Sequence, residues 1–319
     1  MGALAFAETA VTIPELVNPL GYGPGIAYEG AGAPRVLFTV DSRGAASRLA
    51  YLEPATRRVV IGPSVLGELR DAQRSRDGRQ VWILCTYGLY RADASDLAIT
   101  ARIKVPKHLH RLTPFAEGGA IALAQPDRIR TPVVLESAPT KTVAITAPTP
   151  DIGFDEGQTS WLLSFWAGEA REFGRDLRPT GRRRGLPRGV TALRQGDDIY
   201  FVSAVRRQHP GVSPEHDAPW VVPEDELCVF SLSGWRILRH RRIAGVQRTI
   251  GIDGRGRILL EGGDKLTAGP TTVVAVDPDS LETLGTHRFA ERAESVSLAG
   301  PSAIAYRVRA PRINVVQWS

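Results

Sequence analysis

One short unit recurs along this chain and constrains its fold more than any other feature. Each copy is a polar turn containing Gly, Asp or Pro, followed at once by a short run of apolar and β-branched residues, a pattern typical of a hairpin that leads into a β-strand. The strands that follow these turns begin at Val36, Val81, Ile121, Trp161, Ile199, Ile258 and Ile304. Successive starts lie 45, 40, 40, 38, 59 and 46 residues apart. This spacing matches four short strands per propeller blade, and no stretch with helical periodicity interrupts the series.

The second half of the unit can be followed as well. In the sixth copy a strand from Thr272 to Val276 is closed by the turn Asp277-Pro278-Asp279-Ser280, and a further strand runs from Leu281 to Phe289. The phrase Val-Val-Ala-Val-Asp-Pro-Asp-Ser-Leu-Glu-Thr-Leu and the hairpin from Ser75 to Trp82 resemble the repeats of bacterial propellers of the YVTN or quinoprotein-dehydrogenase-like type. The resemblance implies an all-β, seven-bladed β-propeller of four-stranded antiparallel blades. It covers the whole chain as a blade pattern and carries over no catalytic residue.

The number of strands predicts how the ring closes. The seventh copy has strands from Ile304 to Val308 and from Ile313 to Trp318, and is one strand short. A propeller must join its first and last blades, because an open ring leaves sheet edges that pair with other chains. The segment from Ala10 to Ile13 is the spare apolar strand. We therefore predict one domain over residues 1–319, in which the N-terminal strand is the outermost strand of the last blade.

Composition excludes several classes of protein. Hydrophobic residues make up 43% and charged residues 23% of the chain, which is ordinary for a folded domain. No run of 18 apolar residues occurs, and the first ten residues have no basic start, so we expect a cytoplasmic protein without a membrane span. Cys85 and Cys228 are too few for a disulfide framework and are expected to be inert buried thiols. Three tryptophans are expected in the blade cores, namely Trp82, Trp161 and Trp166.

One long insertion is expected to shape the mouth of the central channel. The 59-residue interval places it at residues 208–226, between the second and third strands of the fifth blade. Loops at that position share a face with the loops that enter the inner strands, and ligands of propellers usually bind there. The insertion contains His209, His216 and Trp220 together with several acidic residues. We expect it to cover the channel mouth; the alternative is a solvated loop without a ligand.

Aligned starts of the inner strands place a polar side chain near the channel in each blade. These residues are Tyr22, Arg70, His110 with Arg111, Asp151, Arg188, Arg248 and Glu294. A ring with more arginine than carboxylate suits an anionic or carboxylate-bearing ligand, which a guanidinium grips with two parallel hydrogen bonds. The alternative is that these residues pair with one another around a water-filled tunnel.

Histidine is scarce, so the position of each one matters. His108 and His110 are two residues apart and would point to the same side of an extended strand. With a third ligand from His216 or Asp217 they would hold a divalent metal, although no such third ligand is fixed by the spacing. A single histidine near Asp151 or Glu294 would instead act as an acid or base near neutral pH. Solvated loop histidines remain the third alternative.

Basic residues gather in two segments that we expect on neighbouring outer strands. They are Arg175, Arg178, Arg182, Arg183, Arg184 and Arg188, and then Arg236, Arg239, Arg241 and Arg242. Such clusters bind nucleic acids or acidic proteins, but charged residues on outer strands also keep sheet edges from pairing. Because no aromatic residue alternates with these arginines, we expect no nucleic-acid partner.

Together these features predict a monomeric, small-molecule-processing enzyme of the lyase or cyclase type, acting in biosynthesis on a polar or carboxylate-bearing metabolite at the channel mouth. We expect no organic cofactor; a divalent metal is left open. The expected catalytic residues are His110, Asp151 and Glu294. The expected substrate-binding residues are Tyr22, Arg70, Tyr87, His108, Arg111, Arg188, His209, His216, Trp220 and Arg248.

The expected overall shape resembles propeller enzymes of the virginiamycin B lyase and strictosidine synthase types, but the metal-binding His and Glu pattern of the former is not recognisable. The alternative is a non-catalytic scaffold propeller that binds a protein or another ligand. Exposed apolar residues on the face around the channel mouth would favour the scaffold, whereas one deep pocket containing His110 and Asp151 would favour the enzyme.

Overall fold

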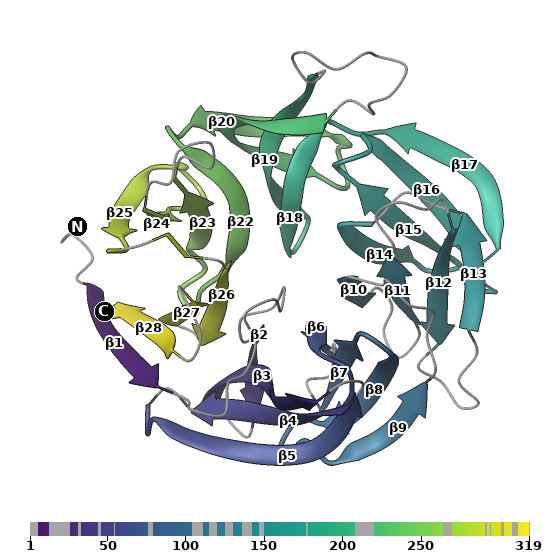
Figure 1. The fold of residues 1–319 in the computed structure, drawn as a ribbon. Helices are drawn as coiled ribbons and strands as arrows, with labels where there is room; N and C mark the ends of the chain where they lie inside the picture. The colour runs from purple at the N-terminus through teal and green to yellow at the C-terminus, as the bar shows by residue number, and fades with distance from the viewer. Residues whose placement is uncertain are drawn as a thin grey trace.

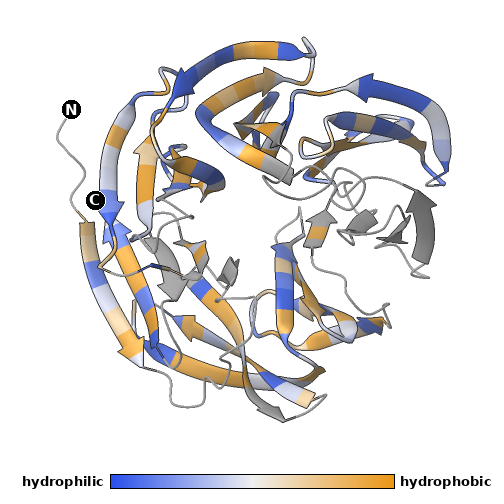
Figure 2. Cartoon of the chain, turned by 45° about the horizontal axis from the view of Figure 1, so that its top comes forward, coloured by the Kyte–Doolittle hydropathy of each residue, from blue (hydrophilic) through white to orange (hydrophobic). Residues whose placement is uncertain are grey.

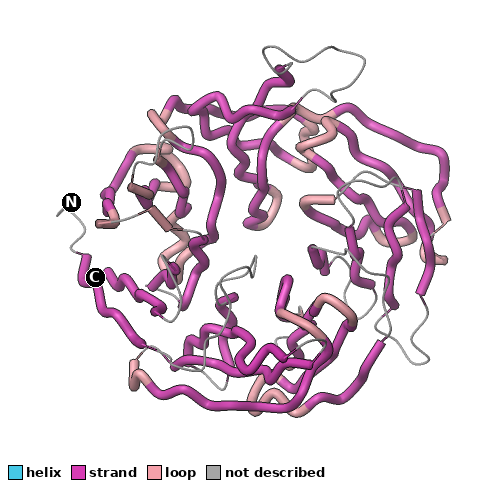
Figure 3. Tube along the Cα trace, viewed as in Figure 1, coloured by secondary structure: helices cyan, strands magenta, loops and turns pink. Residues whose placement is uncertain are grey.

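Seven sheets of β-strands surround a central axis in the computed structural model of the chain (Figure 1). The structure describes residues 6–12, 26–30, 33–43, 46–53, 55–75, 79–103, 111–114, 120–124, 130–135, 142–146, 150–176, 178–207, 220–263, 270–290, 292–293, 295–300, 303–307 and 312–318. Strands and turns account for the regular structure of these residues, and Figure 3 shows no helix among them. Accordingly, this part of the chain offers no apolar helix long enough to cross a bilayer.

The sheets are the blades, numbered here in chain order. Blade 1 consists of β2 (Ile26–Gly30), β3 (Ala33–Arg43), β4 (Ala46–Glu53) and β5 (Arg58–Leu66). Blade 2 consists of β6 (Leu69–Arg74), β7 (Gln80–Cys85), β8 (Gly88–Asp93) and β9 (Ile99–Ile103). Blade 3 consists of β10 (Arg111–Pro114), β11 (Ala120–Ala124), β12 (Arg130–Leu135) and β13 (Thr142–Thr146). Blade 4 consists of β14 (Ile152–Glu156), β15 (Thr159–Ser164), β16 (Glu169–Gly174) and β17 (Pro179–Gly185).

Blade 5 consists of β18 (Gly189–Gln195), β19 (Asp198–Arg207), β20 (Trp220–Ser231) and β21 (Arg236–Arg242). Blade 6 consists of β22 (Val246–Ile252), β23 (Ile258–Gly262), β24 (Thr272–Val276) and β25 (Thr283–Arg288). Blade 7 consists of β26 (Ser295–Gly300), β27 (Ala303–Arg307), β28 (Arg312–Trp318) and β1 (Phe6–Thr12). The order of strands within every sheet is that of the chain, except in blade 7, where β1 lies beside β28.

The predicted repeat is confirmed. Each of the seven predicted strand starts lies within the second strand of a blade, as Val81 does in β7 and Ile258 in β23. The polar turn before it is the hairpin from the inner strand, and all pairings within the blades are antiparallel, for example between Arg74 and Val81. The local turn chemistry of the sequence is therefore sufficient to place the first two strands of each blade.

The predicted closure is also confirmed. β1 pairs with β28 in an antiparallel register that runs from Phe6 opposite Trp318 to Thr12 opposite Arg312. The strand starts earlier than the sequence suggested and ends at Thr12. Figure 1 shows β1 beside β28, so the last sheet is built from the first and last strands of the chain.

Apolar side chains from adjacent blades pack together and form the core. One cluster joins blades 1 and 2 through residues such as Leu37, Leu49 and Ile83, all fully buried. Another joins blades 4 and 5, where the Phe165 ring stacks on Phe201 with centroids 4.6 Å apart. In Figure 2 the middle strands of the blades are mostly orange, which marks hydrophobic residues, and the outer strands are bluer, which marks hydrophilic residues. Each fully buried side chain of this size contributes roughly 1.5–3 kcal/mol, so neighbouring blades stabilise one another.

A shared turn joins the third and fourth strands in four blades. Its last residue has a left-handed backbone: φ is 62° at Leu97, 58° at Leu281, 49° at Trp235 and 57° at Arg57. In blades 2 and 6 that residue is a buried leucine. The preceding aspartate closes the turn; in blade 6 the Asp277 carboxylate accepts the backbone N–H groups of residues 279 and 280, which lowers its pKa. In both turns the leucine side chain fills the core, and its burial offsets the strain of the left-handed backbone.

Both cysteines are buried free thiols, as predicted. Burial raises the pKa of each to about 12, with an opposing effect of Arg70 at Cys85. Because the thiolate is the reactive form, we expect Ellman's reagent at pH 8 to modify neither cysteine in the folded protein and both after unfolding in urea. Modification of the folded protein within minutes would contradict this prediction. Above about pH 9, where an unfolded thiol loses its proton first, the stabilisation from these groups decreases.

Candidate functional site

One face of the ring carries two sets of connections that meet around the channel mouth; we call it the top face. The start of each inner strand pairs with the end of the second strand, as in Leu69 with Cys85 and Ile152 with Leu163. The loops that enter the inner strands therefore lie at the same end as the turns between the second and third strands. The loops that were predicted to bind a ligand therefore share one face.

Several predicted site residues lie outside the described residues: Tyr22, His108, His110, His209, His216 and Glu294. Arg111 and Trp220 are the first residues of β10 and β20. Within the insertion predicted at 208–226, residues 220–226 belong to β20, and residues 220–223 pair with β19, for example Trp220 with Arg207. The hairpin of blade 5 is lengthened there, and its connection at residues 208–219 is outside the described part of the chain.

Asp151 lies directly before β14 and fixes a turn of its own blade. One carboxylate oxygen accepts the backbone N–H of Phe165 at 2.6 Å and that of Trp166 at 3.4 Å. The Asp151 backbone N–H is donated to the carbonyl of Leu163 at 2.7 Å. These contacts hold the turn after β15 against the start of β14. The carboxylate that was predicted to be catalytic therefore stabilises a turn.

The predicted channel arginines are held by contacts within and between blades. Arg248 of β22 forms an ion pair with Glu261 of β23 at 2.5 Å and donates to the carbonyl of Val296 in blade 7 at 3.4 Å. Arg70 of β6 donates to the Thr86 hydroxyl at 3.2 Å. Arg188 lies half-buried beside Gly168, where a Cβ atom would come within 3.2 Å of its Cγ. These contacts are made with residues outside the predicted ring, and they fasten strands and blades to one another.

Further polar residues, which the sequence did not single out, fasten adjacent blades. The Asp71 carboxylate of blade 2 accepts the backbone N–H of Leu112 in blade 3 at 2.5 Å. Between blades 5 and 6, the Thr249 N–H is donated to the Thr191 hydroxyl at 2.9 Å. Because each bond joins residues more than 40 positions apart, no local sequence signal could have revealed it.

In the described residues no three His, Cys, Asp or Glu side chains gather as a metal site.

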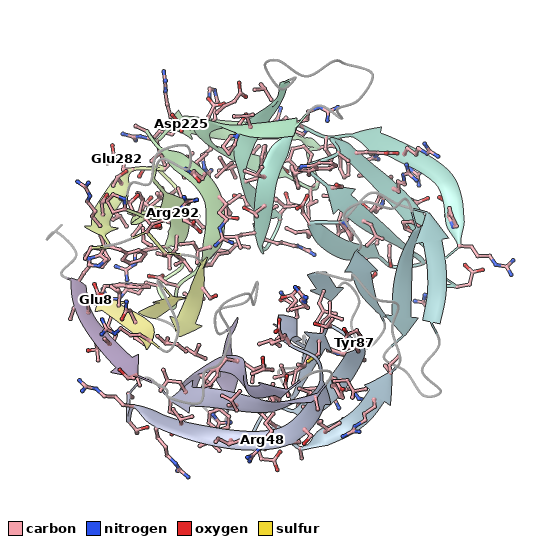
Figure 4. The ribbon with its side chains drawn as sticks, in the orientation of Figure 1. Glu8, Arg48, Tyr87, Asp225, Glu282 and Arg292 are labelled. Carbon is pink, nitrogen blue, oxygen red and sulfur yellow. The ribbon has the colours of Figure 1, made fainter. Side chains whose placement is uncertain are left out.

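Large apolar side chains are exposed on the top face. Leu66 is 48% exposed just before β6, and Tyr87 is 37% exposed in the turn between β7 and β8 (Figure 4). The two lie side by side, since the Tyr87 N–H is donated to the Leu66 carbonyl at 3.2 Å. Trp166 is 46% exposed in the corresponding turn of blade 4. We call Leu66, Tyr87 and Trp166 the top-face patch.

The exposure of Trp166 corrects one prediction. Trp82 and Trp161 are buried in the blade cores as expected, but Trp166 is not. Its neighbour Phe165 fills the core position instead, and the turn held by Asp151 directs the next side chain outward. Phe165 and Trp166 both lie in the turn after β15, and the sequence does not tell which of the two rings faces the core.

Comparison with solved structures identifies the fold. The WD40 domain of Neurospora crassa Pan2 aligns over 99% of this chain and 96% of its own, with a TM-score of 0.65 and 11% identity. A chain from the crystal structure of the mitotic checkpoint complex covers 96% and 92%, with a TM-score of 0.62 and 7% identity. The C-terminal WD40 domain of Sif2 covers 99% and 98%, with a TM-score of 0.58 and 12% identity.

No family model matches the sequence, and no curated protein matches it. Identities of 7–12% establish shared architecture and leave activity open. The chain therefore has a β-propeller fold that resembles WD40 domains.

Proposed function

We propose that this protein is a non-catalytic scaffold propeller that binds a protein partner on its top face. The observation that carries the proposal is the top-face patch, in which Leu66, Tyr87 and Trp166 expose large apolar surface at the ends of rigid blades. Trp and Tyr are enriched among the residues that dominate binding energy at protein interfaces. A typical interface contains about 20–30 residues on each side, enough to span several blades of one face.

The turns that present the patch are well fixed. Gly67 has φ of 81°, and a Cβ atom there would lie 2.7 Å from the Thr86 Cβ and 2.9 Å from the Tyr87 ring. The Leu66 N–H is donated to the buried Tyr90 hydroxyl at 2.6 Å. Asp151 holds the turn of Trp166 in the same way. A backbone held like this loses little conformational entropy on binding, which favours affinity.

Two further findings support a scaffold over an enzyme. The described candidates for chemistry and for anion binding, among them Asp151 and Arg248, already make structural contacts. One of the similar propellers belongs to a structure of a complex, the mitotic checkpoint complex. We also propose that the repeats are of the YVTN type. Such repeats would build the same kind of scaffold.

Affinity capture tests the proposal. The wild type, a Leu66→Asp/Trp166→Ala variant and an Ile61→Asp/Ile237→Asp control are used as baits in an extract of cells that make the protein. Ile61 and Ile237 are exposed to a similar degree but lie on the outer strands β5 and β21, so the control introduces similar polarity away from the top face. Bound proteins are identified by quantitative mass spectrometry.

We expect at least one protein to be captured by the wild type and the control and lost with the top-face variant. The purified partner should then bind the variant at least tenfold more weakly, since losing one buried aromatic anchor costs about 2 kcal/mol or more. A captured set that the top-face variant leaves unchanged would contradict the proposal, as would conversion of a metabolite that depends on Asp151.

A further inference from the structure

Positive charge is concentrated on the outer strands of blades 4 and 5. Residues 175–188 and 236–242 contain ten arginines and one aspartate, a net charge of +9, whereas the whole chain carries +6. The rest of the chain therefore has a net charge of −3. A general excess of basic residues does not account for this distribution, because the excess exists only in these two segments. A field of this kind attracts polyanions.

The two outer strands follow one another around the rim. β17 curves along the outer edge of the ring, and its arrow points toward blade 5 in Figure 1. There the Trp235 indole N–H, at the start of β21, is donated to the carbonyl of Gly185 at the end of β17, at 3.2 Å. We call the exposed or half-exposed arginines along this path the arginine band: Arg175, Arg178, Arg182, Arg183, Arg184, Arg236, Arg239, Arg241 and Arg242. At about 3.3 Å per residue, the two seven-residue strands together extend roughly 45 Å.

Carboxylates neutralise only part of the band. Ion pairs join Arg178 to Asp176, Arg182 to Glu172, Arg183 to Glu169, Arg239 to Asp198 and Arg241 to Glu282. Glu169 is shared, because Arg171 also binds it at 2.9 Å. Within the described part of the chain, Arg175, Arg184, Arg236 and Arg242 form no ion pair, so at least four guanidinium groups offer uncompensated charge. Glu282 of blade 6, labelled in Figure 4, lies 3.4 Å from Arg241 at the end of the band.

The structure preorganises the centre of the band. The Arg184 guanidinium lies 4.5 Å from the centre of the Trp235 ring and 5.3 Å from that of Trp161. Arg182 is bound at 2.7 Å to Glu172, a carboxylate only 2% exposed that also accepts the hydroxyl of Thr180. Within the two basic segments of the sequence, no aromatic residue alternates with the arginines. The fold supplies aromatic residues from other strands, as supports beneath the guanidinium groups.

The shape of β17 argues against an acidic peptide that adds a strand. The pairing of β16 with β17 shifts register between Arg171 and Phe173, and Gly181 in that bulge has φ of 89°. Bulges at sheet edges interrupt the backbone ladder that an added strand would need. All seven residues of β17 are exposed, so its side chains are free to contact a ligand. Recognition must therefore come from guanidinium groups, which bind phosphate in a bidentate manner.

From these observations we propose that the arginine band binds the sugar–phosphate backbone of a nucleic acid, without reading base sequence. The evenly repeated charge of such a backbone matches a basic strip of this length, and no exposed aromatic side chain lies in the band to stack on bases. The band is built from side chains of the outer strands and needs no residue of the top-face patch, so the proposal does not depend on the proposed function.

Fluorescence anisotropy tests this inference with the full chain. The probes are fluorescein-labelled dT20, U20, a 20-base-pair duplex and a peptide of twenty glutamates, each in 50–200 mM KCl. We expect the nucleic acids to bind. If four phosphates are neutralised, affinity should fall over this range by about 50-fold for the single strands and about 150-fold for the duplex. Whichever nucleic acid binds most tightly identifies the form of the ligand, and the glutamate peptide should bind at least tenfold more weakly than that form.

Matched charge-reversal variants locate the site. Arg178→Glu/Arg236→Glu/Arg242→Glu should weaken binding more than tenfold and reduce the salt slope by about 2. The control, Arg58→Glu/Arg102→Glu/Arg288→Glu, makes the same change of charge on exposed positions of β5, β9 and β25, and should have a much smaller effect. Should the first variant fail to fold by circular dichroism, Gln replaces Glu in both.

Three outcomes would overturn the proposal. They are absence of nucleic-acid binding by the wild type below 100 µM in 50 mM KCl, equal weakening by both variants, and binding of the glutamate peptide as tight as that of the nucleic acids. The last result would assign the band to an acidic protein.

Discussion

Deletion of residues 1–12 is expected to prevent the ring from closing and to yield aggregated or strongly destabilised protein. β1 forms the outer strand of blade 7 through seven residue pairs with β28. It also contacts both neighbouring blades: the Phe6 ring lies 5.2 Å from His287 of blade 6, and Val11 packs against the cluster that contains Val36 and Phe38 of blade 1. Without β1, the edge of β28 is exposed and two core clusters lose their cover.

The measurement is thermal unfolding followed by circular dichroism, with light scattering to detect aggregates. A deletion of residues 1–5, which leaves β1 whole, serves as the control and should remain soluble with an unchanged melting temperature. We expect the 1–12 deletion to lower the melting temperature by more than 10 °C or to give insoluble protein. A soluble deletion variant that melts within 2 °C of the wild type would show that β1 does not close the ring.

Substitution of Asp253 by alanine should cause a large loss of stability. This carboxylate, 5% exposed in the turn between β22 and β23, binds the Arg257 guanidinium at 2.6 Å and the Trp318 indole N–H at 3.2 Å. It also accepts the backbone N–H groups of Arg255 and Arg257. Because Arg257 is only 7% exposed, removal of Asp253 leaves a buried charge without its partner. Breaking such a pair costs roughly 3–5 kcal/mol.

Thermal melting checks this prediction, with an expected decrease of about 6–10 °C for Asp253→Ala. The control is Asp279→Ala, an exposed aspartate of the same blade, which should change stability by less than 1 kcal/mol. The double variant Asp253→Ala/Arg257→Met removes both charges and should recover part of the loss, because no guanidinium is then buried alone. Equal melting temperatures for Asp253→Ala and Asp279→Ala would refute the structural role assigned to Asp253.

Much of the fold could be predicted because its signals are local. The turns before Val81 and Ile258 are polar and rich in glycine, and the strands that follow alternate or are wholly apolar, so hairpin and strand are specified within about ten residues. Closure by β1 followed from counting strands. The left-handed leucines at 97 and 281 were not foreseen, since φ at a single position is not apparent in composition.

The candidate site could be predicted only in part, because its chemistry depends on contacts distant in sequence. Asp151 was correctly placed at the start of an inner strand, yet its partners are N–H groups 14 and 15 residues away. Exposure of Trp166 depends on which of two aromatic residues turns inward. Likewise, Arg184 gains its aromatic support from Trp235, 51 positions along the chain. The sequence therefore shows where arginines are concentrated, whereas the tertiary structure determines which of them form ion pairs.

Site-specific photocrosslinking tests the central claim, that the top face is the binding surface, most directly. A photoreactive phenylalanine derivative is placed at Tyr87 or Trp166, and at Ile61 or Ile237 on the rim as controls, in cells that make the protein. The account predicts that the same polypeptide is crosslinked from positions 87 and 166 and not from 61 or 237. If no polypeptide is crosslinked from positions 87 and 166 above the level at the rim positions, the top face is not a protein-binding surface.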